Sequence, residues 1–324
     1  MIEPAIDVHL SQEHTSRSLR MDVLNGLSAR PKTLPPKWFY DARGSELFEQ
    51  ITALDEYYPF RAEHEILTDR ADELAEVTGA RTLVELGSGS SEKTRLLLDA
   101  LTAEATLRQF VPLDVSESAL REAARAIAAA YPGVDVHGVV GDFSEHLDRL
   151  PGVVPRMVAF LGGTIGNLAP SERAKFLASV RGVLESGEWL LLGTGLVIDP
   201  AVMVPAYDDA SGVTAEFNRN VLRVLNNELG ADFDPAAFEH VARWNAEHER
   251  IEMWLRATRR MRVAVPGVGM AVDFAEGEEL MTEISTKFRR EVVADELSAA
   301  GFELRHFWTD RAQRFAVSVA RAAE

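Results

Sequence analysis

The segment VELGSGSSEKT, residues 84–94, combines two close glycines with three serines and a Lys-Thr pair. Glycines at this spacing let a ligand approach the backbone closely. A P-loop has its second glycine where this chain has Glu92, and a dinucleotide-binding loop has its third glycine there. A carboxylate at that position would repel phosphate charge. The loop therefore favours a ligand that carries no phosphate.

Carboxylates end the next two strands expected along the chain. Asp114 closes the run 108–115, and Asp142 with Phe143 closes the run 134–143. Ligands of open parallel sheets bind beyond the carboxyl ends of the strands, so these residues should lie near the glycine loop. Asp114 suits ribose hydroxyls, Asp142 accepts from an adenine amine, and Phe143 covers the ring. Together they predict S-adenosylmethionine, a sulfonium cation, with Lys93 facing its carboxylate.

Each of these features also has a purely structural explanation. Gly87 and Gly89 could simply form a turn, and Asp114 and Asp142 could cap the helices that follow. A nucleotide-dependent kinase or dehydrogenase requires a loop that tolerates Glu92. A binding protein without catalysis is the other alternative.

Composition narrows the class of protein further. The chain has 324 residues, a formal net charge of −17 and no cysteine. This charge argues against a nucleic-acid partner, because phosphate contacts need a basic face. The sequence shows no apolar run of membrane-spanning length, no secretory signal and no His-Glu-x-x-His or similar spacing. We expect a cytoplasmic protein with no metal and no membrane partner.

The elements that must position these residues follow from the hydrophobic pattern. Between residues 81 and 196 short apolar runs alternate with amphipathic helices, which predicts an α/β fold with a parallel sheet covered on both faces. Residues 303–308 and 314–321 read as a strand pair that forms an antiparallel edge. The first sixty residues and residues 206–244 read as helices. Residues 250–265 and 269–274 read as antiparallel strands.

Nearly the whole chain resembles one family, on the stretches LPPKWFYD, EYYP, LVELGSGSSEKTRLLLDAL, GDFSEHL, FLGGTIGNL, AYDDASGVTAEFNRNVL, RIEMWLRA and GEELMTEISTKFR. These are similar to actinobacterial histidine Nα-methyltransferases of ergothioneine biosynthesis. The resemblance implies a Rossmann-like class I methyltransferase domain at 59–196 and 286–324, and a mixed α+β substrate-binding domain at 1–58 and 197–285. It also implies a monomer that methylates the α-amine of L-histidine three times, through mono- and dimethyl intermediates, to hercynine.

The resemblance also assigns site residues. Those for the cofactor are Gly87, Ser88, Lys93, Asp114, Asp142 and Phe143. Those for the substrate are Asn167 and Tyr207 at the carboxylate, Tyr57, Glu283 and Ser285 at the imidazole, and Tyr40 and Met253 along the pocket. In an extended segment Glu283 and Ser285 would share one face, with Ile284 facing the core. Glu283 can accept from an imidazole N–H, and a serine hydroxyl can donate or accept.

The chain departs from the family pattern at four positions, namely Gly163, Gly195, Ile198 and Thr286, where we expect serine, an acid, a base and cysteine. The departures at Gly195 and Ile198 follow a strand end, so cofactor affinity or loop order could differ. No dedicated histidine base is visible, and a tyrosine hydroxyl acting through water is our hypothesis for the neutral amine. Another aromatic amino acid, tryptophan or tyrosine, is the alternative substrate.

Overall fold

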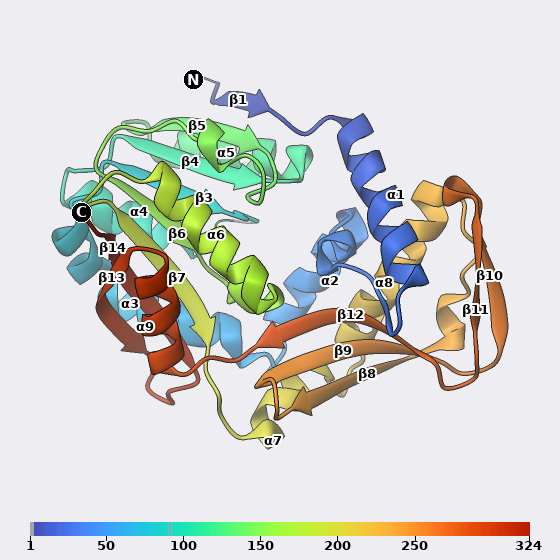
Figure 1. The fold of residues 1–324 in the computed structure, drawn as a ribbon. Helices are drawn as coiled ribbons and strands as arrows, with labels where there is room; N and C mark the ends of the chain where they lie inside the picture. The colour runs from blue at the N-terminus through green and yellow to red at the C-terminus, as the bar shows by residue number, and fades with distance from the viewer. Residues whose placement is uncertain (1–2, 90, 92) are drawn as a thin grey trace. The chain divides into compact units, whose positions relative to one another are not determined.

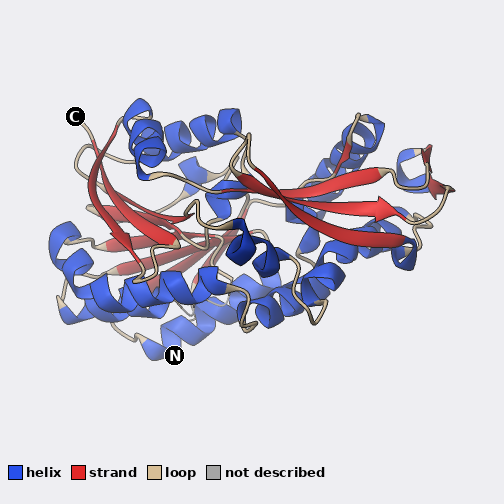
Figure 2. Cartoon of the chain, turned by 90° about the horizontal axis from the view of Figure 1, so that it is seen from below, coloured by secondary structure: helices blue, strands red, loops and turns tan. Residues whose placement is uncertain are grey.

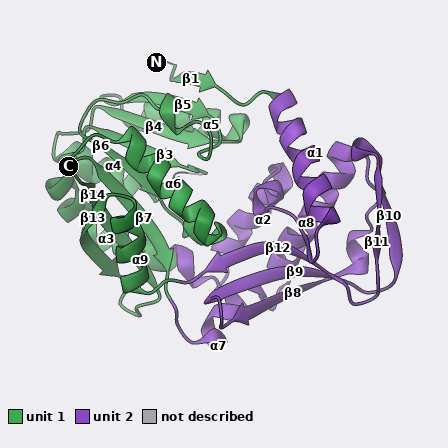
Figure 3. Ribbon diagram, in the orientation of Figure 1, with its two compact units in different colours: residues 1–11, 61–196, 288–324 green, residues 12–60, 197–287 purple. Residues whose placement is uncertain are grey.

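The computed structural model describes residues 3–89, 91 and 93–324. Its chain divides into two compact units, coloured separately in Figure 3. Unit 1 comprises Met1–Ser11, Arg61–Leu196 and Phe288–Glu324, and unit 2 comprises Gln12–Phe60 and Val197–Lys287. The expected boundaries at 58/59 and 285/286 lie close to these limits. The sequence analysis assigned the first eleven residues to the substrate-binding domain. In the structure they belong to unit 1, because their strand joins its sheet.

Unit 1 is built on an eight-stranded sheet in the order β1-β5-β4-β3-β6-β7-β14-β13 (Figure 1). The strands are β1 (Ala5–Val8), β3 (Thr82–Leu86), β4 (Gln109–Asp114), β5 (Asp135–Val140), β6 (Arg156–Phe160), β7 (Trp189–Gly195), β13 (Phe302–Thr309) and β14 (Phe315–Ala322). In this spatial order, the strands β1, β5, β4, β3, β6 and β7 run parallel to one another. Strand β14 is antiparallel to both β7 and β13. The predicted parallel sheet with an antiparallel edge is confirmed.

Helices lie on both sides of this sheet (Figure 2). They are α3 (Tyr58–Thr78), most of which belongs to unit 1, α4 (Thr94–Ala103), α5 (Glu117–Ala130), α6 (Pro170–Val183) and α9 (Arg290–Ala299). Their ends follow local chemistry: the Ser116 hydroxyl accepts from Ala119 N–H to begin α5, and Gly79 follows α3 with a φ of +52°. On one face, alternate strand residues such as Val84, Val111 and Leu190 pack with Phe176 of α6 and Leu297 of α9.

The strand order brings three strand ends to one place. From β3 the chain runs outward to β4 and β5, then crosses back to β6 on the other side of β3. This is a topological switch point, the usual ligand site of such sheets. The register pairs Leu86 with Leu113 and Asp114 with Val140. The loop after β3, Asp114 and the residues after β5 therefore share the carboxyl edge of the sheet, as the sequence predicts.

Unit 2 contains a four-stranded sheet in the order β2-β12-β9-β8 and a separate pair, β10 and β11. Its strands are β2 (Lys32–Thr33), β8 (Phe238–Asn245), β9 (Arg250–Ala257), β10 (Met261–Val265), β11 (Met270–Phe274) and β12 (Glu279–Thr286). Its helices include α1 (Gln12–Ser28), α2 (Ala42–Thr52), α7 (Pro200–Met203) and α8 (Val213–Leu229). Helix α8 buries Phe217, Val221 and Leu225 and ends at Gly230, whose φ is +63°.

Several expected elements are wrong. The first sixty residues contain two strands, β1 and β2, and residues 238–245 form β8 rather than a helix. In β8 Phe238 and His240 are buried and Glu239 is exposed, a period of two that a helical interpretation overlooks. The expected strand 250–265 is broken after Ala257 by a turn, so β9 and β10 belong to different sheets. Within the described residues, no helix combines the length and apolar character needed to cross a membrane.

Candidate active site

The loop after β3 opens with two glycines in the left-handed region. Gly87 has a φ of +73° and Gly89 of +48°, conformations that favour glycine. The Gly87 N–H donates to Leu113 O at 2.8 Å, which ties the loop to the end of β4. Among the described residues, apart from each glycine's own chain neighbours, no heavy atom lies within 4 Å of where a Cβ would stand at either glycine. The backbone is therefore open to a ligand at both positions.

Asp114 ends β4 and holds this loop. Its Oδ2 accepts from Gly89 N–H at 3.2 Å, and its Oδ1 accepts from Ser116 N–H at 2.9 Å. Burial raises the pKa of Asp114, and the backbone N–H groups act in the opposite direction. Asp114 is thus both part of the loop's structure and an acceptor at the strand end, where the sequence predicts a ribose partner.

Glu85 anchors the same loop from inside the sheet. Its carboxylate accepts from the Ser91 hydroxyl at 3.2 Å and from the Thr94 hydroxyl. Burial raises the pKa of Glu85 to about 7, although both hydroxyl bonds lower it. One carboxylate thus connects the loop to the first turn of α4.

Lys93 pairs with a carboxylate that the sequence analysis did not identify. Its Nζ binds Glu63 of α3, whose side chain is fully buried. Both oxygens of Glu63 also accept from Gly162 N–H, at 2.9 Å each. Lys93 was predicted to face the carboxylate of the methyl donor. In the structure it is held at the loop by an internal carboxylate.

Asp142 and Phe143 follow β5. Asp142 Oδ1 accepts from the Ser144 N–H at 2.8 Å and from its hydroxyl at 2.6 Å, so the side chain also stabilises its own turn. The Phe143 ring packs on Phe160 and Phe176, with centroids 5.1 and 5.5 Å away. These contacts fix the ring at the carboxyl edge, where the sequence predicts an adenine neighbour.

Two observations fit S-adenosylmethionine in this loop. Ser88 Oγ is buried and has no hydrogen-bond partner among the described residues, so it can serve a polar ligand atom. The space beside Gly87 and Gly89 admits a close neighbour. Glu92, whose type argued against phosphate, lies outside the described residues. In the part of the chain that is described, no cluster of His, Asp or Glu is suited to hold a metal ion.

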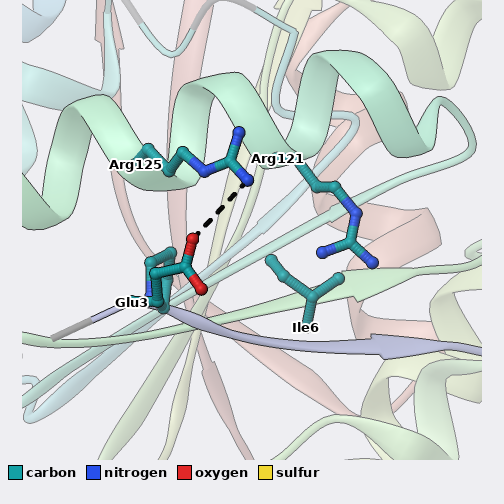
Figure 4. Close-up of a pocket in the computed structure, with 5 residues that line it drawn as sticks. Glu3, Ile6, Arg121 and Arg125 are labelled. Carbon is teal, nitrogen blue, oxygen red and sulfur yellow. Dashed lines mark ion pairs between the residues drawn. The ribbon is translucent and has the colours of Figure 1, made fainter.

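A surface hollow elsewhere in unit 1 is not this site. It is lined by Glu3, Ile6, Arg121 and Arg125, and Figure 4 shows the ion pair between Glu3 and Arg125, at 3.8 Å. It lies at the amino end of β1, the opposite end from the one where parallel sheets bind ligands.

Asn167 closes a short 3-10 helix, Thr164–Asn167, after β6 in unit 1, whereas the other predicted substrate residues belong to unit 2. Its side chain is half-buried. The preceding Gly163 has a φ of +71°, and a Cβ there would lie 3.3 Å from the Phe315 ring. The glycine at this position, where the sequence analysis expects serine, thus matches the local packing.

Tyr207 and Ser285 meet in unit 2. Tyr207 belongs to the 3-10 helix Val204–Tyr207 and Ser285 to β12, and their hydroxyls are 2.8 Å apart. The buried Lys287 completes a triangle, with Nζ donating to Tyr207 Oη at 2.7 Å and to Ser285 Oγ at 2.9 Å. Burial and the Glu283 charge raise the pKa of Tyr207 well above its usual value, so this phenol stays protonated and is not a base.

Strand β12 is extended at Glu283 and Ser285, as the sequence predicts, and its period of two places both side chains on one face. Glu283 lies opposite Met253 of β9, which is buried. Ile284, which the sequence predicts to face the core, is half-buried, and that orientation stays a prediction. On the same strand Leu280 is fully buried.

The two other predicted tyrosines belong to an aromatic cluster of unit 2. Tyr57 packs edge-on against Tyr207 and Phe48, with centroids 6.3 and 6.2 Å away. Tyr40 packs against Phe48 and Phe217 and is 42% exposed. The structure therefore links Tyr57 directly to Tyr207, and Tyr40 to Tyr57 through their shared neighbour Phe48.

A buried polar network supports the backbone of Tyr207. His240 Nε2 donates to Tyr207 O at 2.8 Å, while its Nδ1 accepts from Asn218 Nδ2 at 2.8 Å. Asn218 Oδ1 accepts in turn from the Thr282 hydroxyl at 2.6 Å. Burial lowers the pKa of His240, which favours the neutral ring that this pattern requires.

The sequence analysis missed Glu63, Glu85 and Lys287. Two of them left a signal: Glu85 is a charge inside an apolar strand, and Lys287 continues the alternation of Glu283 and Ser285. Glu63 left none, because a glutamate on an amphipathic helix is ordinary.

Comparisons with known proteins identify the family of the chain. A family model described as "Histidine-specific methyltransferase, SAM-dependent" matches residues 19–322. The chain is 56% identical over 312 residues to the histidine N-alpha-methyltransferase of Mycolicibacterium smegmatis, covering 96% of this chain and 97% of that protein. It is 57% identical over 312 residues to the enzyme of the same name from Mycobacterium tuberculosis, with the same coverage. It is 35% identical over 231 residues to ergothioneine biosynthesis protein 1 of Neurospora crassa, covering 70% of this chain and 26% of that protein. The chain belongs to the family of histidine-specific, S-adenosylmethionine-dependent methyltransferases.

Proposed function

We propose that this protein transfers methyl groups from S-adenosylmethionine to the α-amine of L-histidine. The observation that carries the proposal is the match of nearly the whole chain to two histidine N-alpha-methyltransferases. The proposed product is the trimethylated amino acid, hercynine, formed through mono- and dimethyl intermediates. The Neurospora relative, by its name, supports a place in ergothioneine biosynthesis, for which this would be the first step.

The proposed donor site lies on unit 1. Gly87 and Ser88 would face the ligand through open backbone and a buried hydroxyl without a partner in the described chain. Asp114 would accept from the ribose, Asp142 and Phe143 would contact the adenine, and Lys93 would add a positive charge. When bound, S-adenosylmethionine supplies a methyl group activated by its sulfonium charge.

The proposed histidine site draws its ring partners from unit 2. Glu283 would accept an imidazole N–H, while Ser285 and Tyr57 would complete the ring contacts and Tyr40 and Met253 would line the pocket. Tyr207 and Asn167 would hold the substrate carboxylate, since a phenol and an amide are neutral donors for it. Correct placement of donor and acceptor can supply roughly 7–11 kcal/mol of a barrier.

The residues are suited to repeated transfer. The α-amine must turn between successive methylations, so the chain should hold the carboxylate and the ring and leave the amine free. The assigned side chains contact the carboxylate, the ring or the cofactor, and none of them is assigned to the amine. Tyr207 cannot serve as the base, because its raised pKa keeps it protonated. We also propose that the protein works as a monomer and that it works in the cytoplasm; a chain without cysteine suits that reducing compartment.

One experiment tests the proposal against its alternatives. The protein is incubated with S-adenosylmethionine and, separately, with histidine, tryptophan or tyrosine, and the products are weighed by mass spectrometry. We expect gains of one, two and three methyl groups on histidine alone, and none in a reaction without the donor. Preferential methylation of tryptophan or tyrosine would contradict the proposal.

A further inference from the structure

Lys287 lies in unit 2 beside two residues proposed to bind the substrate, yet it has no assigned role. Its side chain is buried, and its ammonium donates to both the Tyr207 and the Ser285 hydroxyls. Its backbone N–H donates to Glu249 O at 2.8 Å, which fixes the strand end that carries it. A buried ammonium is costly unless it is hydrogen-bonded, so this position needs an explanation.

The triangle of Lys287, Tyr207 and Ser285 determines where its hydrogens go. A protonated lysine only donates, so each hydroxyl oxygen accepts one hydrogen from it. The contact of 2.8 Å between the two hydroxyls uses the hydrogen of one of them. The hydrogen of the other hydroxyl is not used within the triangle. With Lys287 charged, the pair therefore presents a hydrogen-bond donor outward.

We propose that Lys287 is a positioning residue that makes the Tyr207–Ser285 pair a donor to the unprotonated nitrogen of the substrate's imidazole. This inference rests on the proposed function and revises it at Tyr207: the pair's single outward hydrogen goes to the ring, so Asn167 is left as the donor to the substrate carboxylate. Glu283, two residues before Ser285 on the same strand face, supplies the acceptor. One acceptor beside one donor matches a neutral imidazole, which has one N–H and one bare nitrogen. A benzene ring offers neither group.

The charge of Lys287 gives the proposal a pH signature. Burial lowers the pKa of Lys287 from the ordinary 10.5, while Tyr58 of α3 and Glu283 of β12 favour its charged form. Tyr207, the other titratable group in contact with it, stays protonated because its own pKa is raised. As pH rises, Lys287 therefore loses its proton at a lower pH than an exposed lysine does. Its nitrogen can then accept a hydroxyl hydrogen, and the outward donor is lost.

The test measures binding of trimethylated histidine, whose quaternary amine does not titrate, by calorimetry. Trimethylated phenylalanine, which lacks ring nitrogens, is the matched probe. We expect the wild-type protein to prefer the histidine probe, and this preference should weaken as pH rises and Lys287 loses its proton. In Lys287→Met the hydroxyl lone pairs that Lys287 occupied are open, so the Tyr207–Ser285 pair is no longer restricted to donating; the preference should fall about tenfold at neutral pH and show no further dependence on pH. Lys287→Gln, which keeps an N–H donor without charge, should retain more of the preference, also without pH dependence.

Lys32→Met is the control for loss of a buried lysine elsewhere in unit 2. Lys32 pairs with Glu278 and lies 4.7 Å from the Phe274 ring centroid. Its replacement should lower the melting temperature without changing the ratio of the two probe affinities. If Lys287→Met prefers the histidine probe as strongly as the wild-type protein does, the proposed role of Lys287 is wrong. It is also wrong if the wild-type preference is constant with pH. Failure of the wild-type protein to bind the histidine probe at any pH overturns the proposed function itself, and the inference with it.

Discussion

Gly193 of β7 is the position where a single methyl group tests the internal carboxylate of unit 1. A Cβ at this residue would lie 2.1 Å from Glu63 Oε1 and 3.3 Å from Glu63 Cδ and from the Phe315 ring. Cβ contacts under 3.0 Å are essentially never seen, so in Gly193→Ala the carboxylate must move by about 1 Å. Glu63 is fully buried and is bonded to Lys93 and Gly162, so moving its carboxylate disturbs both of these contacts.

The cost has two parts. Overpacking of a filled core costs about 1–3 kcal/mol. A displaced Glu63 also leaves the Gly162 N–H without its acceptor, which adds about 1–3 kcal/mol. We therefore expect Gly193→Ala to lower the free energy of unfolding by at least about 2 kcal/mol. Affinity for S-adenosylmethionine should fall as well, because Lys93 loses the partner that holds it at the loop.

Urea unfolding and calorimetry with S-adenosylmethionine measure the two effects. Gly182→Ala is the matched control, because Gly182 lies in α6 and, beyond its chain neighbours and its own helix backbone, no described atom lies within 4 Å of its would-be Cβ. That variant should be as stable as wild type or gain about 0.5–1 kcal/mol. If Gly193→Ala behaves like Gly182→Ala in both assays, Glu63 does not occupy the place described, and our account of the loop fails.

Three further predictions concern single carboxylates. The pKa of Glu85 is raised from 4.5 to about 7, so its contribution to stability is full below pH 4.5 and is lost as pH rises through about 7. Glu85→Gln should remove this decline of about 3 kcal/mol, and parallel urea-unfolding curves of both proteins across that window would refute the effect. Asp114→Ala should abolish binding of S-adenosylmethionine by calorimetry, and retained affinity would reject the ribose assignment. Glu283→Ala should raise the KM for histidine far more than that for the donor, and an unchanged histidine KM would exclude Glu283 as the ring partner.

The fold of unit 1 was predictable because its signals are local. Apolar strands of five to seven residues alternate with amphipathic helices, and Asp114 and Ser116 have the residue types that strand ends and helix N-caps require. The strand β8 was not predictable in the same way, because it follows helix α8 closely and mixes polar and apolar residues. Its pairing with β9 is a tertiary contact that outweighs local preference.

The site was predictable where residue type alone indicates chemistry. Gly87, Gly89 and Asp114 lie together as expected, because strand order brings the ends of β3 and β4 side by side. The pairing of Lys93 with Glu63 was not predictable, since 30 residues separate them and neither position is unusual for its element. The triangle at Lys287 also needed the structure, because Tyr207 is 80 residues away along the chain.

The most direct test of the central claim is the position of the transferred methyl groups. Histidine is incubated with S-adenosylmethionine carrying an isotopically labelled methyl group, and the product is fragmented in the mass spectrometer. Our account predicts three labelled methyl groups, all on the α-nitrogen, with the imidazole unlabelled. Label on the imidazole ring, or a reaction that stops after one methyl group with donor in excess, would contradict it.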